Sequence, residues 1–293
     1  MSPEPSMSSQ SVVHESDTRS KQRTSQPTRT KIQANFQIAR PAPKSSLGFA
    51  PKLLLQIQQL AQNERPVPVL EIWQPPFHKS KLTRHFHQKV KMRSGDVYAT
   101  LDESYITNST GRQRDFSNAE QDSDGASLQK DIVAAMCHND NTTSTIYFRD
   151  ARCRWQTGVS TGPAQSTPNY RFTINDENRD ISDPGRMIFQ WENRSKEDAP
   201  AGSSDAEQFV LLLIDRKARR KCRIATMTPG GFKIVVRKSS TLEHLQMCFG
   251  LTEPITSTMF QDPHEALEVW LYTQTLTLGA WVAYQEGWLN YNQ

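Results

Sequence analysis

The segment LEVWLYTQTLTLGAWVAYQEGWL, residues 267–289, decides the fold of this chain. Helical spacing puts apolar side chains on all sides of it: Leu267, Trp270, Leu271, Leu278, Trp281 and Val282 on one side, and Val269, Tyr272, Leu276, Ala280 and Ala283 on the other. A helix that is apolar all round is buried in a protein core or spans a membrane.

Length and polarity decide between core and membrane. The run without a charge covers 16 positions, from Val269 to Tyr284, and includes Gln274 and three threonines. A membrane span takes about 20 consecutive apolar residues. We therefore predict a helix buried in a soluble domain. A membrane-associated helix is the alternative, and a transmembrane span is disfavoured.

The start of this helix is marked by three residues in the sequence QDPHEALEVW. Asp262 can cap the first turn, Pro263 suits the first helical position, and Glu265 follows the cap by three residues. The pattern predicts a C-terminal helix over 263–289.

Short runs rich in β-branched and aromatic residues occupy most of residues 79–239 and alternate with Gly, Pro, Asn, Asp and Ser clusters. They are GDVYATL, SLQKDIVAAMC, STIYFRDARCRWQTG, NYRFTIN, GRMIFQWEN, EQFVLLLID, KCRIATM and GFKIVVRK. Such runs predict strands, and the alternation of Tyr170 and Phe172 with Arg171 is typical of an antiparallel sheet with one face in a core. TPGG at 228–231 and DRKARRK at 215–221 predict turns. Polar segments near 107–127, 157–168 and 194–207 predict long loops.

The N-terminal part is polar up to residue 48, with seven Lys and Arg against three Asp and Glu. This composition predicts a disordered basic tail over 1–48. In PKLLLQIQQLAQ, the helical spacing from Pro51 predicts one short amphipathic helix over 51–61. The following RPVPVLEIW contains two prolines and predicts an extended segment with Val69 and Ile72 or Trp73 packed inward.

Together these patterns predict a mainly β (α+β) protein with a single β-rich domain over 51–293. Its strands form an antiparallel β-barrel or a strongly curved sheet around the hydrophobic C-terminal helix, with the short N-terminal helix before them.

Charge and cysteine usage restrict the compartment and the class of partner. The net charge of +4 lies in the first 48 residues and the remainder is balanced, which disfavours a nucleic-acid-binding domain. Four cysteines without a C-x-x-C pair fit neither a disulfide scaffold nor a zinc site. The first residues resemble neither a secretory signal nor a mitochondrial presequence. We expect an intracellular, cytoplasmic protein that is not secreted, with the nucleus left open.

Two basic clusters are the candidate anion-binding residues. The first comprises Arg216, Lys217, Arg219, Arg220, Lys221 and Arg223, and the second Lys79, Lys81, Arg84, Lys89, Lys91 and Arg93. A compact cationic hairpin tip can contact phosphoinositide headgroups, act as a nuclear import signal, contact a phosphate backbone, or simply be a solvated turn. The second cluster, if helical, presents a basic amphipathic surface to lipid or nucleic acid.

Catalytic and metal-binding motifs are absent from the sequence. There is no G-x-S-x-G, Walker loop, G-x-G-x-x-G or H-E-x-x-H. Cys137 and His138 are adjacent, but neighbours in a strand point to opposite faces. His85 and His87 lack a nearby carboxylate or cysteine and make a poor metal site. We predict no catalytic residues, no metal and no cofactor. The tryptophans could line a ligand cavity, but we interpret them as core residues.

Several of these motifs carry a resemblance to known families. KLLLQxQ at 52–58, RPVPVL at 65–70 and WVAxxEGW at 281–288 resemble an uncharacterised family of filamentous-fungal proteins, as do IVAAMC at 132–137, the Trp-bearing strand at 146–155 and FVLLLIDRKARRKCRIATM at 209–227. More distantly, strands followed by one apolar helix resemble the tubby-like and LURP-one-like fold, a closed antiparallel barrel threaded by a C-terminal helix. The distant resemblance implies phosphoinositide binding or lipid scrambling, although no lipid-binding motif matches residue by residue.

Functionally, the sequence favours a binding or scaffold protein without enzymatic activity, whose basic loops contact an anionic lipid or a protein partner. The alternative is an accessory or catalytic protein of a fungal biosynthetic pathway that acts on a small molecule in a cleft. The sequence leaves the oligomeric state open.

Overall fold

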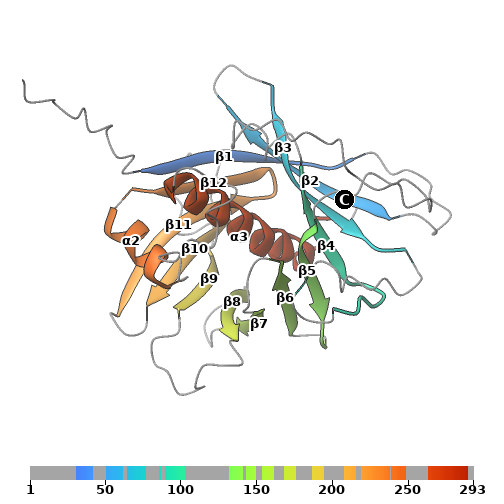
Figure 1. The fold of residues 1–293 in the computed structure, drawn as a ribbon. Coiled ribbons are helices and arrows are strands. Elements are labelled where there is room, and N and C mark those ends of the chain that lie inside the picture. Colours follow the sequence, from blue (N-terminus) through green and yellow to red (C-terminus); the bar gives the residue numbers. More distant parts are fainter. Residues whose placement is uncertain are drawn as a thin grey trace, which may run out of the picture.

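Twelve antiparallel strands form a closed barrel around the C-terminal helix (Figure 1). The computed structural model describes residues 31–41, 51–61, 65–76, 86, 90–102, 132–140, 143–149, 154–161, 168–175, 187–194, 208–215, 219–237, 239–248 and 263–289. The strands are β1 (Ile32–Ala39), β2 (Lys52–Leu60), β3 (Val67–Gln74), β4 (Val97–Leu101), β5 (Ile132–His138), β6 (Ser144–Phe148), β7 (Arg154–Thr161), β8 (Pro168–Asn175), β9 (Met187–Asn193), β10 (Phe209–Asp215), β11 (Arg220–Thr228) and β12 (Gly231–Val236).

Each strand pairs with its neighbours in the chain, and β1 joins β2 to β12 and closes the ring. Alternate residues face the interior. In β1, Ile32, Ala34 and Phe36 are buried, whereas Gln33 and Asn35 are exposed. Closure removes the free sheet edges that invite aggregation. The prediction of a barrel is confirmed, and the turns at 215–221 and 228–231 connect β10 to β11 and β11 to β12.

One N-terminal prediction is wrong in part and another is wrong entirely. The range 1–48 was predicted to be a disordered tail, but Ile32–Ala39 within it form β1, so the barrel starts before residue 51. Residues 1–30 lie outside the described residues. The helix predicted over 51–61 is the strand β2, whose backbone pairs with β1 on one side and β3 on the other.

The helix was predicted at β2 because the apolar residues of LLLQIQQL fit both the helical period and the two-residue period of a strand. Leu55 and Ile57 alternate with Gln56 and Gln58 as in a strand, and both apolar side chains are completely buried. An isolated helix of about ten residues is marginal in water. Pairing on both edges therefore overrides the helical spacing. The extended segment predicted next is β3, with Val69 and Ile72 buried as expected.

Helix α3 (Pro263–Gln285) runs through the middle of the ring of strands (Figure 1). Leu271, Leu276 and Leu278 are completely buried, and Trp281 is 1% exposed. The Trp281 ring meets Tyr170 and Phe172 of β8 edge to face, with centroids 5.6 Å and 5.5 Å away. The predicted burial of this helix inside the strands is confirmed. Among the described residues, no helix has the length and apolarity that crossing a membrane requires.

The helix ends four residues earlier than predicted because EGW forms a C-terminal cap. Gly287 has a φ of 74°, in the left-handed region that glycine adopts without strain. Its N–H donates to the Tyr284 carbonyl (3.1 Å), and the Trp288 N–H donates to the Ala283 carbonyl (2.9 Å). These two bonds are those of a Schellman motif. The final apolar residues are therefore a cap that closes α3.

A second helix, α2 (Ser239–Cys248), was not predicted and follows β12. Leu242 and Leu245 join the main core, and Thr241 Oγ1 lies 3.7 Å from Cys222 Sγ.

Part of the loop predicted over 157–168 is a strand, because β7 continues to Thr161. The predicted loop over 107–127 lies outside the described residues, as does the one over 194–207 except for Arg194.

The barrel has two different ends. At the exit end, where α3 finishes, Tyr284 O–H points to the Gly95 carbonyl (3.4 Å) and Tyr170 O–H donates to Glu286. The chain reaches this end after β5, β7, β9 and β11. At the entry end, where α3 begins, lie α2 and the β10–β11 connection.

Polar side chains inside the barrel lack partners in the protein. Among the described residues they include Gln274 Oε1, Thr275 Oγ1 and Thr277 Oγ1 of α3 and the indole N–H groups of Trp191 and Trp281, all in buried residues. An unpaired buried donor or acceptor costs about 1–3 kcal/mol. These groups therefore need hydrogen-bond partners in the folded protein.

Candidate anion-binding surface

The β10–β11 hairpin carries the described part of the first basic cluster. Arg219 lies in the turn with a φ of 51°. Arg220 begins β11 directly opposite Asp215, and Lys221 lies opposite Ile214. Cys222 packs against the core, so Lys221 and Arg223 on either side of it face outward. All four basic residues are exposed. Arg216 and Lys217 lie outside the described residues.

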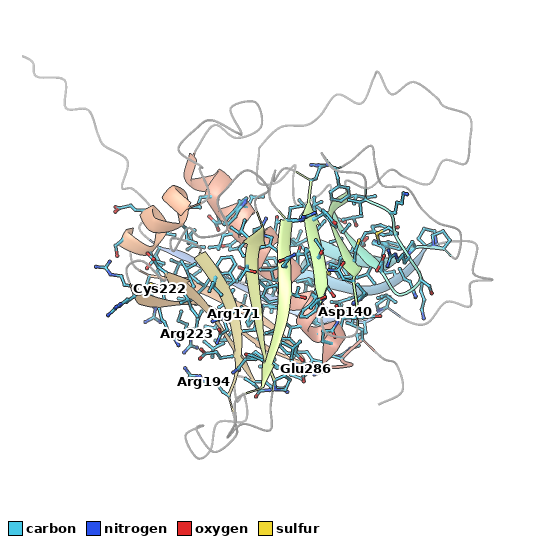
Figure 2. The ribbon with its side chains drawn as sticks, turned by 90° about the horizontal axis from the view of Figure 1, so that it is seen from below. Asp140, Arg171, Arg194, Cys222, Arg223 and Glu286 are labelled. Atoms are coloured by element: carbon cyan, nitrogen blue, oxygen red, sulfur yellow. The ribbon has the colours of Figure 1, made fainter. Side chains whose placement is uncertain are left out.

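The sheet adds a cation that is distant in sequence. Arg171 of β8 pairs with Gln190 of β9, Gln190 with Leu212 of β10, and Leu212 with Arg223 of β11. These three inter-strand steps of about 4.8 Å place the backbones of the two arginines about 14 Å apart on one outer face. Arg194 follows β9 and is also exposed. Figure 2 shows Arg171, Arg194 and Arg223 along this side of the barrel.

We call the outer face of β8–β11 with its hairpin tip the basic face. Its described residues hold six exposed cations, Arg171, Arg194, Arg219, Arg220, Lys221 and Arg223, against two carboxylates, Glu192 and Asp215. Asp215 is only 9% exposed. Between the cations, Leu212 and Ile214 are half-buried and face outward. The face is thus both cationic and partly apolar.

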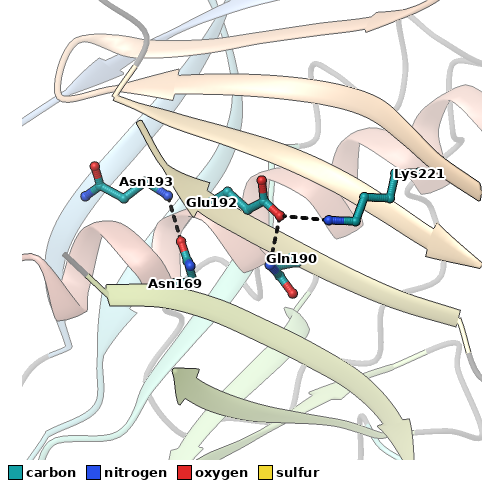
Figure 3. A network of polar contacts seen from close by, with 5 residues as sticks. All are labelled: Asn169, Gln190, Glu192, Asn193 and Lys221. Carbon is teal, nitrogen blue, oxygen red and sulfur yellow. Dashed lines mark hydrogen bonds and ion pairs between the residues drawn. The ribbon is translucent and has the colours of Figure 1, made fainter. Parts of the chain in front are cut away.

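Glu192 is the carboxylate that reaches into the basic face. Its Oε1 lies 3.5 Å from Lys221 Nζ and accepts a hydrogen bond of 3.0 Å from Gln190 Nε2 (Figure 3). The Lys221 side chain is 60% exposed, and a surface pair of this kind contributes about 0–1 kcal/mol. A stronger anion can therefore compete for Lys221 at little cost.

The second basic cluster forms a separate surface. Its described members, Lys91 and Arg93, are exposed on either side of buried Met92, whose Sδ lies 3.9 Å from Cys137 Sγ on the outside of β5. Lys79, Lys81, Arg84 and Lys89 lie outside the described residues. Phe86, Val90 and Met92 form a small apolar cluster with Ala135.

Strand order keeps the two clusters apart. Five strands separate β5 from β11 in either direction around the ring. Arg93 is at the exit end, where Asp96 accepts its backbone N–H and that of His138, whereas the β10–β11 tip is at the entry end. The two clusters therefore cannot contact one flat surface together.

The adjacent residues Cys137 and His138 point to opposite faces, as predicted. Cys137 contacts Met92 outside the barrel, and burial, with a further contribution from the Asp96 carboxylate, raises the pKa of its thiol to about 12. His138 points inward, where its Nδ1 lies 3.0 Å from Ser144 Oγ and its ring lies 5.4 Å from that of Tyr284. A thiol with this pKa is a poor nucleophile at neutral pH.

The pairing of His138 with Ser144 was not predicted, since neither residue belongs to a recognisable motif. Ser144 is 2% exposed, and the second ring nitrogen of His138 has no partner to orient the imidazole. A nucleophilic serine needs an accessible hydroxyl and an oriented base. This pair therefore gives no basis for catalysis. Within the described ranges, no three His, Cys, Asp or Glu side chains group as metal ligands.

No protein-family model, curated protein or solved structure matches this chain. The outward orientation of Arg171 is predictable from the sequence, because it lies between the inward-facing residues Tyr170 and Phe172. Its proximity to Arg223 required the strand order.

Proposed function

We propose that this protein is a non-enzymatic binding protein that contacts anionic lipid headgroups through its basic face. The observation that carries the proposal is the excess of six exposed cations over two carboxylates on one side of the barrel. Near an anionic surface each Lys or Arg contributes about 1 kcal/mol. Several such contributions together suffice for reversible attachment.

The character of the basic face favours lipid over nucleic acid. Half-buried Leu212 and Ile214 lie among the cations, and interfacial proteins combine apolar and basic side chains in this way. Single-stranded nucleic acids are bound by exposed aromatic side chains on which bases stack. The outward positions of β8–β11 in the described residues include no aromatic side chain. The distant tubby-like resemblance supports the same class of partner.

Liposome flotation of the full chain tests this proposal. We expect the wild type to float with vesicles containing phosphatidylserine and phosphoinositide, and binding to fall with rising salt. Arg219→Glu plus Arg220→Glu replaces two cations with two carboxylates, and the loss of the cations alone is worth about 2 kcal/mol or at least roughly 30-fold in affinity. Arg171→Glu should weaken binding as well if the surface extends to β8.

The second cluster offers a matched control. Lys91→Glu plus Arg93→Glu makes the same change in net charge at the other end of the barrel and should leave binding largely intact. Equal loss in both double variants would show that only total charge matters and would reject the basic face. Equal binding to neutral phosphatidylcholine vesicles would reject anionic recognition altogether.

A further inference from the structure

One face of α3 presents a row of unpaired polar atoms to the barrel interior. Gln274, Thr277 and Trp281 are spaced by three and four residues and therefore lie on the same side of the helix. Gln274 Oε1, Thr277 Oγ1 and Trp281 Nε1 have no hydrogen-bond partner in the protein. Their residues are 3%, 0% and 1% exposed.

A further unpaired donor lies on the facing strands. Trp191 of β9 is completely buried, and its Nε1 has no partner either. Trp191 is in register with Tyr170, whose ring is 5.6 Å from that of Trp281. Two indole donors thus flank one tyrosine. The Tyr170 hydroxyl donates to Glu286 at the exit end, and neither indole N–H donates to its oxygen.

The types of group on this face define what would satisfy them. Two indole N–H groups need an oxygen acceptor, and Gln274 Oε1 needs a donor. The threonine hydroxyl can do either. The unpaired polar atoms of this face belong to uncharged side chains, so a charged molecule would be buried without a counter-ion, which is costly.

We infer that a small neutral hydroxyl-bearing molecule binds inside the barrel, between this face of α3 and strands β8 and β9. Water is the smallest member of that class, and buried water commonly bonds such groups. An alcohol or another small hydroxylated compound is the other candidate, because its hydroxyl group can donate and accept hydrogen bonds as water does. This site is independent of the basic face.

The substitution Thr277→Val tests the site because valine has nearly the same shape and helix propensity as threonine. If the hydroxyl binds a buried molecule, its loss should lower Tm by about 2–4 °C. If the hydroxyl has no partner, valine removes a buried unpaired group and Tm should rise. The direction of the change in Tm therefore shows whether the Thr277 hydroxyl has a hydrogen-bond partner.

Thr273→Val is the matched control. Its Oγ1 donates to the Val269 carbonyl of the same helix (2.8 Å), and the residue is half-buried. It should change Tm less than Thr277→Val does. A rise in Tm for Thr277→Val would overturn the inference, as would equal changes in the two variants.

The identity of the bound molecule is read from the wild-type protein. If the bound molecule is an alcohol or another small hydroxylated compound, denaturing the purified chain should release it in stoichiometric amount. Mass spectrometry of the extract would then detect it. Otherwise, nuclear Overhauser contacts between the indole protons of Trp191 and Trp281 and a long-lived water should appear. Finding neither the compound nor the water contact would overturn the inference.

Discussion

Arg40 donates a hydrogen bond of 2.9 Å from its Nε to the carbonyl of Trp288, 248 residues later in the chain. Its Nη2 also reaches the Pro229 carbonyl at 3.4 Å. One side chain thus joins the end of β1, the β11–β12 turn and the cap of α3. Arg40 therefore links the barrel to its internal helix at the exit end by hydrogen bonds.

The first prediction concerns this contact. Arg40→Ala should lower the stability by about 1 kcal/mol, the net value of a typical hydrogen bond, and Tm by about 2–4 °C. Thermal unfolding followed by circular dichroism measures the change. Arg171→Ala removes another exposed arginine and should leave Tm unaltered. Equal Tm values for wild type and Arg40→Ala would show that the contact contributes nothing.

A second prediction addresses the role of α3 as the core of the barrel. Trp281→Asp places a carboxylate where the side chain is 1% exposed and among aromatic rings, and the domain should not fold. Val159→Asp, at a position 41% exposed, should fold normally. Far-ultraviolet circular dichroism and gel filtration compare the two. A folded monomeric Trp281→Asp variant would contradict the assignment of α3 to the core.

A third prediction tests whether β1 is a required strand. Deleting residues 1–41 removes the strand that bridges β2 and β12, leaving two unpaired edges and part of the core uncovered. The truncated protein should aggregate or unfold. Deleting residues 1–30 keeps all twelve strands that the structure describes and should give a protein of unchanged Tm. Equal stability of the two truncated proteins would show that β1 is not required for the fold.

A fourth prediction follows from two groups that are protonated in the folded protein. Burial, with the Glu71 carboxylate adding to it, raises the pKa of Tyr98 from 10.0 to about 12. The pKa of Cys137 is raised from 9.0 to about 12. Their contribution to stability is present at neutral pH, declines once the unfolded chain begins to lose these protons, and is lost as pH rises towards 12.

Urea denaturation between pH 8 and pH 11 measures this decline. Tyr98→Phe and Cys137→Ser each remove one of the groups, and the loss of stability with pH should be smaller in each variant. An identical pH dependence in wild type and in the Tyr98→Phe, Cys137→Ser double variant would assign the decline to other groups.

The sequence by itself determined the strand-rich middle of the chain and the place of the final helix. Alternation around Tyr170 and Phe172 is a local property of a strand, and an apolar surface on all sides of 267–284 can only be buried. Neither conclusion needs knowledge of which strands are neighbours. The turn at 228–231 was likewise readable, because proline and glycine restrict the local backbone directly.

Only the tertiary structure decided which residues meet. β2 became a strand because β1 and β3 pair with both of its edges, and β1 itself lies in a segment whose composition suggested disorder. The basic face combines Arg171 with Arg223 through the order of β8–β11, and the same order separates the second cluster from it. Local patterns fix backbone preferences over a few residues, whereas pairing partners depend on chain closure over hundreds of residues. That closure also brought β8, which carries Tyr170, against Trp281 of α3.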